Sequence, residues 1–148
     1  MKKVLLLALL IFGFGVNAQK SNEDNAIYTT VEIAPSFPNG LKALYQYFCE
    51  NTVVPKFIPN KDKINSVIVR FVVEKDGSVS YPEIIRGIND ECDTEALRVI
   101  KSMPKWEAGG INKYSNWKPL RCYMTVLIKF FQNKSDCERS YNQSLRGY

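Results

Sequence analysis

Histidine is absent from the 148 residues of this chain. Its absence removes the usual general base and the Ser-His and Cys-His pairs of nucleophilic catalysis. The four cysteines are widely spaced, so they lack the close ligand pairs of a zinc site. A group of carboxylates at residues 90–95 suits a helix N-terminus, where negative charge is favoured. The sequence therefore predicts no catalytic residue, no metal site and no other cofactor.

A long apolar run that could span a membrane is also missing. The run from Val4 to Val16 falls short of the roughly 20 residues that a bilayer requires. Lys2 and Lys3 precede it, and Val16-Asn17-Ala18 offers small residues where a signal peptidase cuts. We expect residues 1–18 to be a signal peptide, and the processed chain to be periplasmic or secreted to the outer surface.

Strong charge of one sign is lacking as well. The net charge is +5, two of these charges lie in the leader, and basic and acidic residues are interleaved. A charge this mild and interleaved does not argue for nucleic acid, so we expect no nucleic-acid partner. About 130 residues follow the leader, which is the size of one domain with its own core.

Four cysteines follow the leader: Cys49, Cys92, Cys122 and Cys137. In an exported chain an even count is consistent with two disulfides, for which three pairings exist. The alternative is that one or two of them are ordinary buried thiols.

The first part of the processed chain predicts a flexible lead and one helix. Residues 19–30 are polar without apolar periodicity, and residues 31–34 could form a short strand before the Pro38-Asn39-Gly40 turn signal. Asn39 or Gly40 would cap a helix over residues 41–51. Its apolar residues recur at helical spacing: Leu41, Leu44, Tyr45 and Phe48. Residues 56–65 predict a crossing loop.

The clearest local signal is a β-hairpin. Residues 67–73 and 79–88 are two runs of β-branched and aromatic residues, separated by a segment that contains Asp76-Gly77. Gly77 accepts the positive φ that such a turn requires. Alternate residues of the first run would share one buried face: Val67, Val69, Phe71 and Val73.

The remaining segments predict a helix, a loop, a strand and a tail. Asp93 or Thr94 would cap a helix over residues 95–102, which Pro104 ends because proline lacks an N–H and its ring clashes with the helix. Residues 105–118 read as a loop in which Trp106 covers the open end of the core. Residues 120–131 alternate as a long strand, and residues 133–148 form a tail.

This order predicts an α+β fold, a three-stranded sheet made of an antiparallel hairpin and a last strand, with two helices on one face. The first hairpin strand would be central, so its two neighbours would both be edges. An exposed edge is an aggregation hazard unless it is used or guarded.

Several of these segments together resemble the C-terminal domain of TonB, the periplasmic energy transducer of Gram-negative envelopes. The most specific piece is Ser102-Met103-Pro104-Lys105-Trp106 followed by Gly109. Supporting pieces are Phe37-Pro38-Asn39-Gly40, Val54-Pro55 in place of a usual Tyr-Pro, and Asp76-Gly77-Ser78-Val79. The resemblance covers residues 31–132 and implies a TonB C-terminal-like domain.

The resemblance implies a binding module. Family domains are similar in receiving an extended peptide, the TonB box of a transporter, beside their last strand, which is β-augmentation. In this chain the last strand corresponds to residues 121–129. Its outward residues would either contact the peptide or protect the edge from pairing with other chains; they are Arg121, Tyr123, Thr125, Leu127 and Lys129.

The chain departs from a full transducer in the inner-membrane anchor and Pro-rich spacer that it is expected to lack. We therefore expect an exported domain that captures an extended, TonB-box-like peptide or an envelope protein but does not transduce energy from the inner membrane. One alternative is an assembly protein of an envelope complex or an edge-paired homodimer. The other is genuine energy transduction, which the missing anchor disfavours.

The expected topology also ranks the disulfides. Cys92 and Cys137 each follow a strand that ends at the same end of the sheet, whereas Cys122 lies near the other end. We therefore expect a Cys92–Cys137 bridge that ties the tail, with Cys49 and Cys122 as a core pair or as free thiols.

Overall fold

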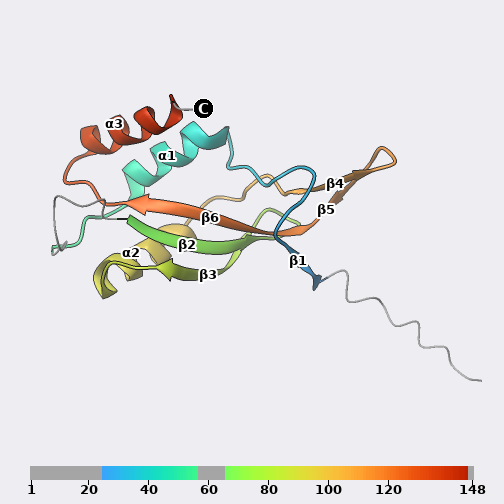
Figure 1. Cartoon of the computed structure of the whole chain (residues 1–148), viewed down its shortest axis with the longest axis horizontal. Coiled ribbons are helices and arrows are strands. Elements are labelled where there is room, and N and C mark those ends of the chain that lie inside the picture. Colours follow the sequence, from blue (N-terminus) through green and yellow to red (C-terminus); the bar gives the residue numbers. More distant parts are fainter. Residues whose placement is uncertain (1–24, 57–65, 147–148) are drawn as a thin grey trace, which may run out of the picture.

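The computed structural model describes residues 25–56 and 66–146. Figure 1 shows their arrangement. The elements in chain order are β1 (Ile27–Tyr28), α1 (Gly40–Asn51), β2 (Ser66–Val73), β3 (Val79–Arg86), α2 (Asp90–Lys101), β4 (Gly110–Lys113), β5 (Asn116–Pro119), β6 (Arg121–Lys129) and α3 (Lys134–Leu145). The expected leader and most of the expected crossing loop lie outside the described residues.

The predicted α+β class is confirmed, but the main sheet has four strands rather than three. Its order is β1-β6-β2-β3, so β2 is central, as the hairpin pattern predicted. β2 runs antiparallel to both β3 and β6. The additional strand, β1, falls within the expected flexible lead and pairs in parallel with the start of β6. A segment of two residues is too short to produce a periodic pattern.

The predicted β2–β3 hairpin is present. At its turn Gly77 has φ +83°, and an Asp76 carboxylate oxygen accepts the backbone N–H of Ser78 at 3.0 Å. A Cβ at Gly77 would lie 2.0 Å from the backbone oxygen of Trp106. The turn therefore needs glycine both for its conformation and for the close approach of the chain beyond α2.

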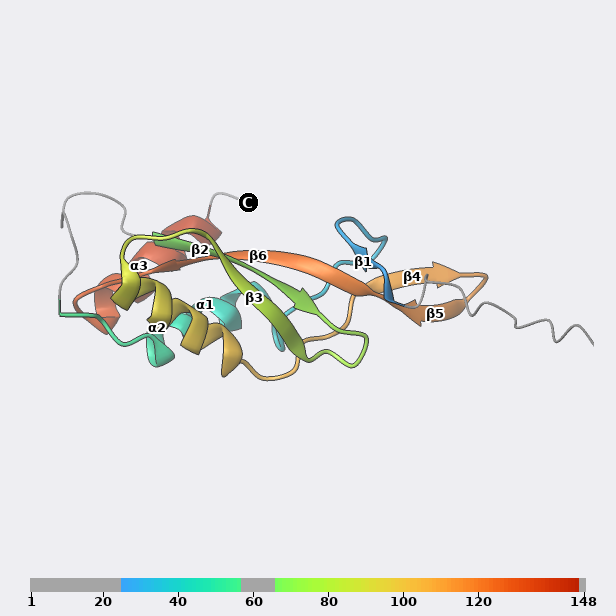
Figure 2. The same cartoon turned by 90° about the horizontal axis from the view of Figure 1, so that it is seen from below.

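The core lies between the sheet and helices on one of its faces. Val67, Val69, Phe71 and Val73 of β2 are fully buried and pack in one cluster with residues of α1, α2 and α3. Figure 2 shows α1 and α2 together on one side of the β2–β6 layer. The two helices expected on one face are thus joined by a third.

Helix α1 matches the predicted range, but α2 begins earlier than expected. Asn39, at φ +65°, precedes α1 without a side-chain cap. The cap of α2 is Asn89, not Asp93 or Thr94, because the Asn89 side chain accepts the N–H of Cys92 at 2.8 Å. Asp93 instead accepts the backbone N–H of Ile88 at 2.9 Å. Asp90, Glu91 and Asp93 then lie in the first turn, where they complement the helix dipole.

The segment 105–118, expected to be a loop, contains a second hairpin. β4 and β5 pair with Asn112 opposite Trp117 and Lys113 opposite Asn116. Tyr114 and Ser115 form the turn, both with positive φ. Sequence signals for such turns rely on Gly or Asn, which explains why this hairpin was not predicted.

The C-terminal tail, for which no helix was predicted, forms helix α3, and its disulfide differs from the expected one. Asn133 caps α3 by accepting the N–H of Asp136 at 2.9 Å. The predicted Cys92–Cys137 bridge is wrong: Cys137 bonds to Cys49, with Cα atoms 5.7 Å apart. The helix returns the tail to α1, which brings Cys137 to Cys49. Cys92 and Cys122 are buried free thiols.

Candidate functional site

The candidate site follows the outer edge of β6. Tyr141 of α3 identifies which backbone groups face outward: its hydroxyl accepts the N–H of Lys129 at 3.3 Å and donates to the carbonyl of Leu127 at 3.4 Å. Because alternate residues of a strand point their backbone groups to the same side, those of Thr125 also face away from β2.

This edge is covered at its two ends and open between them. At the start of β6, β1 pairs with Arg121 and Cys122 only. At the other end, the Tyr141 hydroxyl occupies the edge at Leu127 and Lys129. Within the described residues no strand pairs with the outer side of β6 around Thr125. Backbone donors and acceptors left open on a strand edge can pair with another chain.

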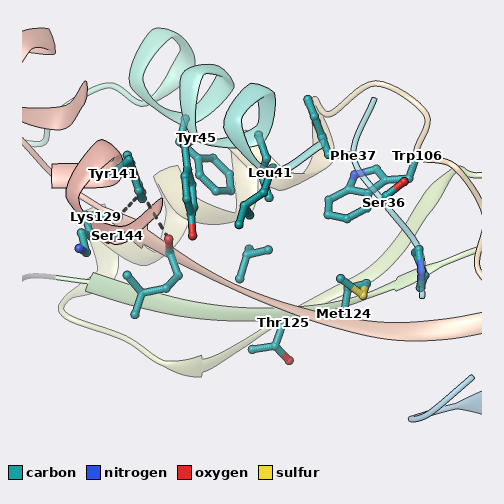
Figure 3. Close-up of a pocket in the computed structure, with 15 residues that line it drawn as sticks. Ser36, Phe37, Leu41, Tyr45, Trp106, Met124, Thr125, Lys129, Tyr141 and Ser144 are labelled. Carbon is teal, nitrogen blue, oxygen red and sulfur yellow. Dashed lines mark hydrogen bonds between the residues drawn. The ribbon is translucent and has the colours of Figure 1, made fainter. Parts of the chain in front are cut away.

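A groove of about 510 Å³ runs beside the open stretch. In Figure 3, Leu41 and Tyr45 extend from α1 toward β6, and Trp106 and Tyr141 lie toward opposite ends. Its wall is mainly apolar and aromatic, as is usual for binding sites. The lining from the helices and their flanks includes Phe37, Leu41, Leu44, Tyr45, Phe48 and Trp106, and β6 adds Met124 and Val126.

The end wall of the groove is an aromatic cluster around Trp106. Its ring meets Phe37 at 5.6 Å and Phe71 at 5.4 Å between centroids, both edge to face. The Trp106 backbone N–H donates to Gly77 O at 2.8 Å, which fixes this segment against the β2–β3 turn. The indole Nε1 is buried without a hydrogen-bond partner among the described residues. Trp106 therefore covers the core, as its position in the sequence suggested, and also borders the groove.

Arg121 is engaged within the domain. Its guanidinium donates to both carboxylate oxygens of Glu74, at 2.7 and 2.9 Å, and to the carbonyl of Asn25 at 2.7 Å. The Arg121 hydrogen bonds, together with one from Ser80, hold the pKa of Glu74 below its usual range. Arg121 thus fastens β1 and the β2–β3 turn to the start of β6.

The other four predicted edge residues share the face of β6 opposite Met124 and Val126, which pack on the core, but three of them still border the groove. Thr125, Leu127 and Lys129 line the groove. Lys129 Nζ lies 3.2 Å from Ser140 Oγ and 5.6 Å from the ring centroid of Tyr141. Tyr123, by contrast, lies opposite Val72 under the guanidinium of Arg70, at 5.0 Å. The alternation of β6 therefore located the strand but not the groove.

The two free thiols of the described residues, Cys92 and Cys122, are buried. Burial raises the pKa of Cys92 and of Cys122, and Asp93 and Glu91 add to the effect at Cys92. A raised pKa keeps a thiol protonated and poorly nucleophilic. In residues 25–56 and 66–146 no three His, Cys, Asp or Glu side chains are grouped to hold a metal ion.

Sequence reasoning missed the helical half of the groove. Leu41, Leu44 and Tyr45 were predicted only as one apolar face of a helix, and Leu41 leaves 46% of its surface exposed. Tyr141 lies in α3, a segment that gives no apolar period. A signal that could have indicated the groove is the group of aromatic residues on α1, Tyr45, Tyr47 and Phe48, because tyrosine is enriched at interfaces.

Comparison with known protein families identifies a related family. Residues 62–130, from just before β2 to just after β6, match the family model described as Gram-negative bacterial TonB protein C-terminal. No curated protein and no solved structure matches the chain. Among the described residues, no helix has the length and hydrophobicity to cross a bilayer.

Proposed function

This chain belongs to the TonB C-terminal family through residues 62–130, and we propose that it captures an extended peptide by strand addition along the outer edge of β6. The family comprises energy-transducing and binding domains rather than enzymes, and its domains are periplasmic and interact with other envelope proteins. The proposed partner is therefore an extended, TonB-box-like segment of an envelope protein.

The observation that carries the proposal is the open stretch of β6 around Thr125 with an apolar groove beside it. A peptide paired with this stretch would gain backbone hydrogen bonds. Its alternate side chains would point into the groove, beside Tyr45 and Trp106, or away from it. Affinity would come from the backbone and specificity from the groove.

The opposite edge of the sheet is less suited to strand addition. β3 contains Pro82, which has no N–H to donate, and Tyr81 has a left-handed φ of +48°. Its pairing with β2 shifts register twice. Proline and bulges are the devices that protect an edge from pairing with other chains. This contrast favours β6 as the receiving strand.

The proposed compartment is outside the cytoplasm. The Cys49–Cys137 disulfide joins α1 to α3, and such bonds persist in oxidising compartments. The expected signal peptide, which lies outside the described residues, agrees with this compartment. The disulfide is therefore the structural feature that supports export to the periplasm or beyond.

An array of overlapping peptides from the envelope proteins of the source organism tests the proposal. Thr125→Pro should abolish binding of the selected peptides, because it removes an outward N–H while leaving the pairing of β6 with β2 intact. The matched variant Thr125→Ala keeps the N–H and should bind as the unaltered protein does. Equal binding by both variants would contradict strand addition at this edge. If the protein instead forms dimers that depend on concentration and that Thr125→Pro abolishes, the edge pairs with a second copy of the chain and not with a peptide.

A further inference from the structure

The β4–β5 hairpin, residues 110–119, projects from the domain as an arm, which Figures 1 and 2 show extending beyond the end of the main sheet. Tyr114 lies at its tip with 88% of its surface exposed. Trp117, with 47% exposed, lies on a flank of the arm opposite Asn112. The arm thus presents two large aromatic side chains away from the core.

The tip carries an aromatic side chain where the backbone disfavours one. Tyr114 and Ser115 have φ values of +51° and +63°, the region that glycine and asparagine adopt most easily. Backbone strain of this kind is concentrated at functional positions. A tyrosine in this turn is therefore difficult to explain by the needs of the hairpin itself.

The charge of the arm has one sign. Residues 110–119 contain Lys113 and Lys118 and no Asp or Glu. Lys118 lies opposite Ile111, on the flank away from Trp117, and Lys113 Nζ lies 5.8 Å from the ring centroid of Tyr114. A carboxylate from outside the arm, that of Glu32, accepts the N–H of Asn112 at 3.0 Å and so adjoins the arm behind its tip.

We propose that the β4–β5 arm docks on the surface of an anionic lipid bilayer with its tip in the interface. Tyr and Trp favour the boundary between headgroups and acyl chains, since their rings are apolar and carry a polar group. Lys113 and Lys118 extend to anionic headgroups from the other flank. The arm would hold the domain at a membrane, with the β6 groove separate from the contact.

The size of the arm favours a membrane over a folded protein partner. Four residues of strand extend about 14 Å, and Tyr114 and Trp117, at 88% and 47% exposure, together present on the order of 300 Å². A stable protein interface buries about 800 Å² on each partner. An interfacial aromatic residue needs no complementary surface, so a narrow tip is sufficient.

The test uses the exported protein and two kinds of vesicle, phosphatidylcholine alone and phosphatidylcholine mixed with phosphatidylglycerol. The mixed vesicles should shift Trp117 emission to the blue, and Trp117→Phe should lose this shift, because Trp106 is already buried. Tyr114→Ser combined with Trp117→Ser should lower the partition coefficient for mixed vesicles, measured by co-sedimentation, about tenfold or more. Lys113→Ala with Lys118→Ala should make this partition coefficient depend less on salt concentration.

The matched controls lie elsewhere on the surface. Tyr81→Ser removes another exposed aromatic residue, and Lys42→Ala with Lys101→Ala removes two exposed lysines; both should bind vesicles as the unaltered protein does. An unchanged Trp117 spectrum, or equal loss in the controls, would overturn the proposal. If a photocrosslinker at position 114 captures a protein and the chain does not bind vesicles, the partner of the arm is a protein and the membrane proposal is wrong.

Discussion

The hydroxyl of Tyr141, in α3, donates a hydrogen bond to the backbone carbonyl of Leu127, in β6, at 3.4 Å. A side chain from the last helix thereby satisfies a backbone group that a neighbouring strand would otherwise bind. The ring of Tyr141 stacks on Tyr45 of α1 with centroids 4.3 Å apart. The helices therefore determine where the open edge of β6 ends.

Replacing Tyr141 by phenylalanine should expose this part of the edge. Tyr141→Phe keeps the ring but leaves Leu127 O and Lys129 N without the hydroxyl. The free energy of unfolding in urea should fall by about 1 kcal/mol, the usual net value of such a hydrogen bond. Tyr114→Phe, at an exposed position, is the control and should change stability by less than about 0.5 kcal/mol. Equal effects of the two variants would contradict the role given to the Tyr141 hydroxyl.

Tyr141 should also make the protein less stable at alkaline pH. Burial raises the pKa of Tyr141 to about 12. The folded state therefore holds this proton more tightly than the unfolded state, in which a tyrosine titrates near pH 10. The resulting stability is complete below pH 10 and is lost as the pH rises to about 12. Urea unfolding across this pH range should show that the free energy of unfolding falls for the unaltered protein and falls less for Tyr141→Phe. The same pH dependence in both proteins would contradict this role of Tyr141.

The disulfide should dominate the stability of the helical layer. Cys49 and Cys137 are separated by 88 residues, and closing a loop of that length stabilises a fold by about 4–5 kcal/mol in the chain-entropy model. Reduction, or Cys49→Ser with Cys137→Ser, should lower the unfolding free energy accordingly, whereas reductant should not affect the double variant. Non-reduced peptide mapping should give a Cys49–Cys137 peptide, and a Cys92–Cys137 peptide would restore the pairing expected from the sequence.

Two glycines with nearly the same φ allow the energetic cost of a positive φ to be measured apart from the cost of a steric clash. Gly40 and Gly77 have φ values of +82° and +83°, but a Cβ meets nothing within 4 Å at Gly40 and meets Trp106 O at 2.0 Å at Gly77. Gly40→Ala should cost about 1–2 kcal/mol. Gly77→Ala should cost clearly more in the same urea measurement, because the Trp106 segment must also move. A smaller cost at Gly77 would mean that this segment is not held against the turn.

The parts of the fold that were predicted from the sequence are those with strong local patterns. The β2–β3 hairpin follows from Asp76-Gly77 between two β-branched runs, and α1 follows from a clear helical period. β4–β5 was missed because its turn lacks glycine. β1 was missed because two residues in a polar lead carry no pattern, and their partner, β6, is distant in the sequence.

The site was predicted only in part, for a related reason. The alternation of β6 identified Thr125 and Leu127, because the period of a strand is local. The groove depends on α1 and α3, whose approach to β6 is a tertiary contact. The disulfide was assigned to Cys92 because the sheet topology alone ignored helix α3, which carries Cys137 to Cys49.

The central claim is that the stretch of β6 around Thr125 is an open edge that receives a strand. Backbone amide hydrogen exchange, measured by NMR with and without an array-selected peptide, tests it most directly. The amides of Met124 and Val126, which face β2, should exchange slowly in both states. The amides of Thr125 and Leu127 should exchange fast in the free protein and become protected when the peptide binds. Peptide binding that leaves Thr125 and Leu127 unprotected, or protects β3 instead, would contradict the account.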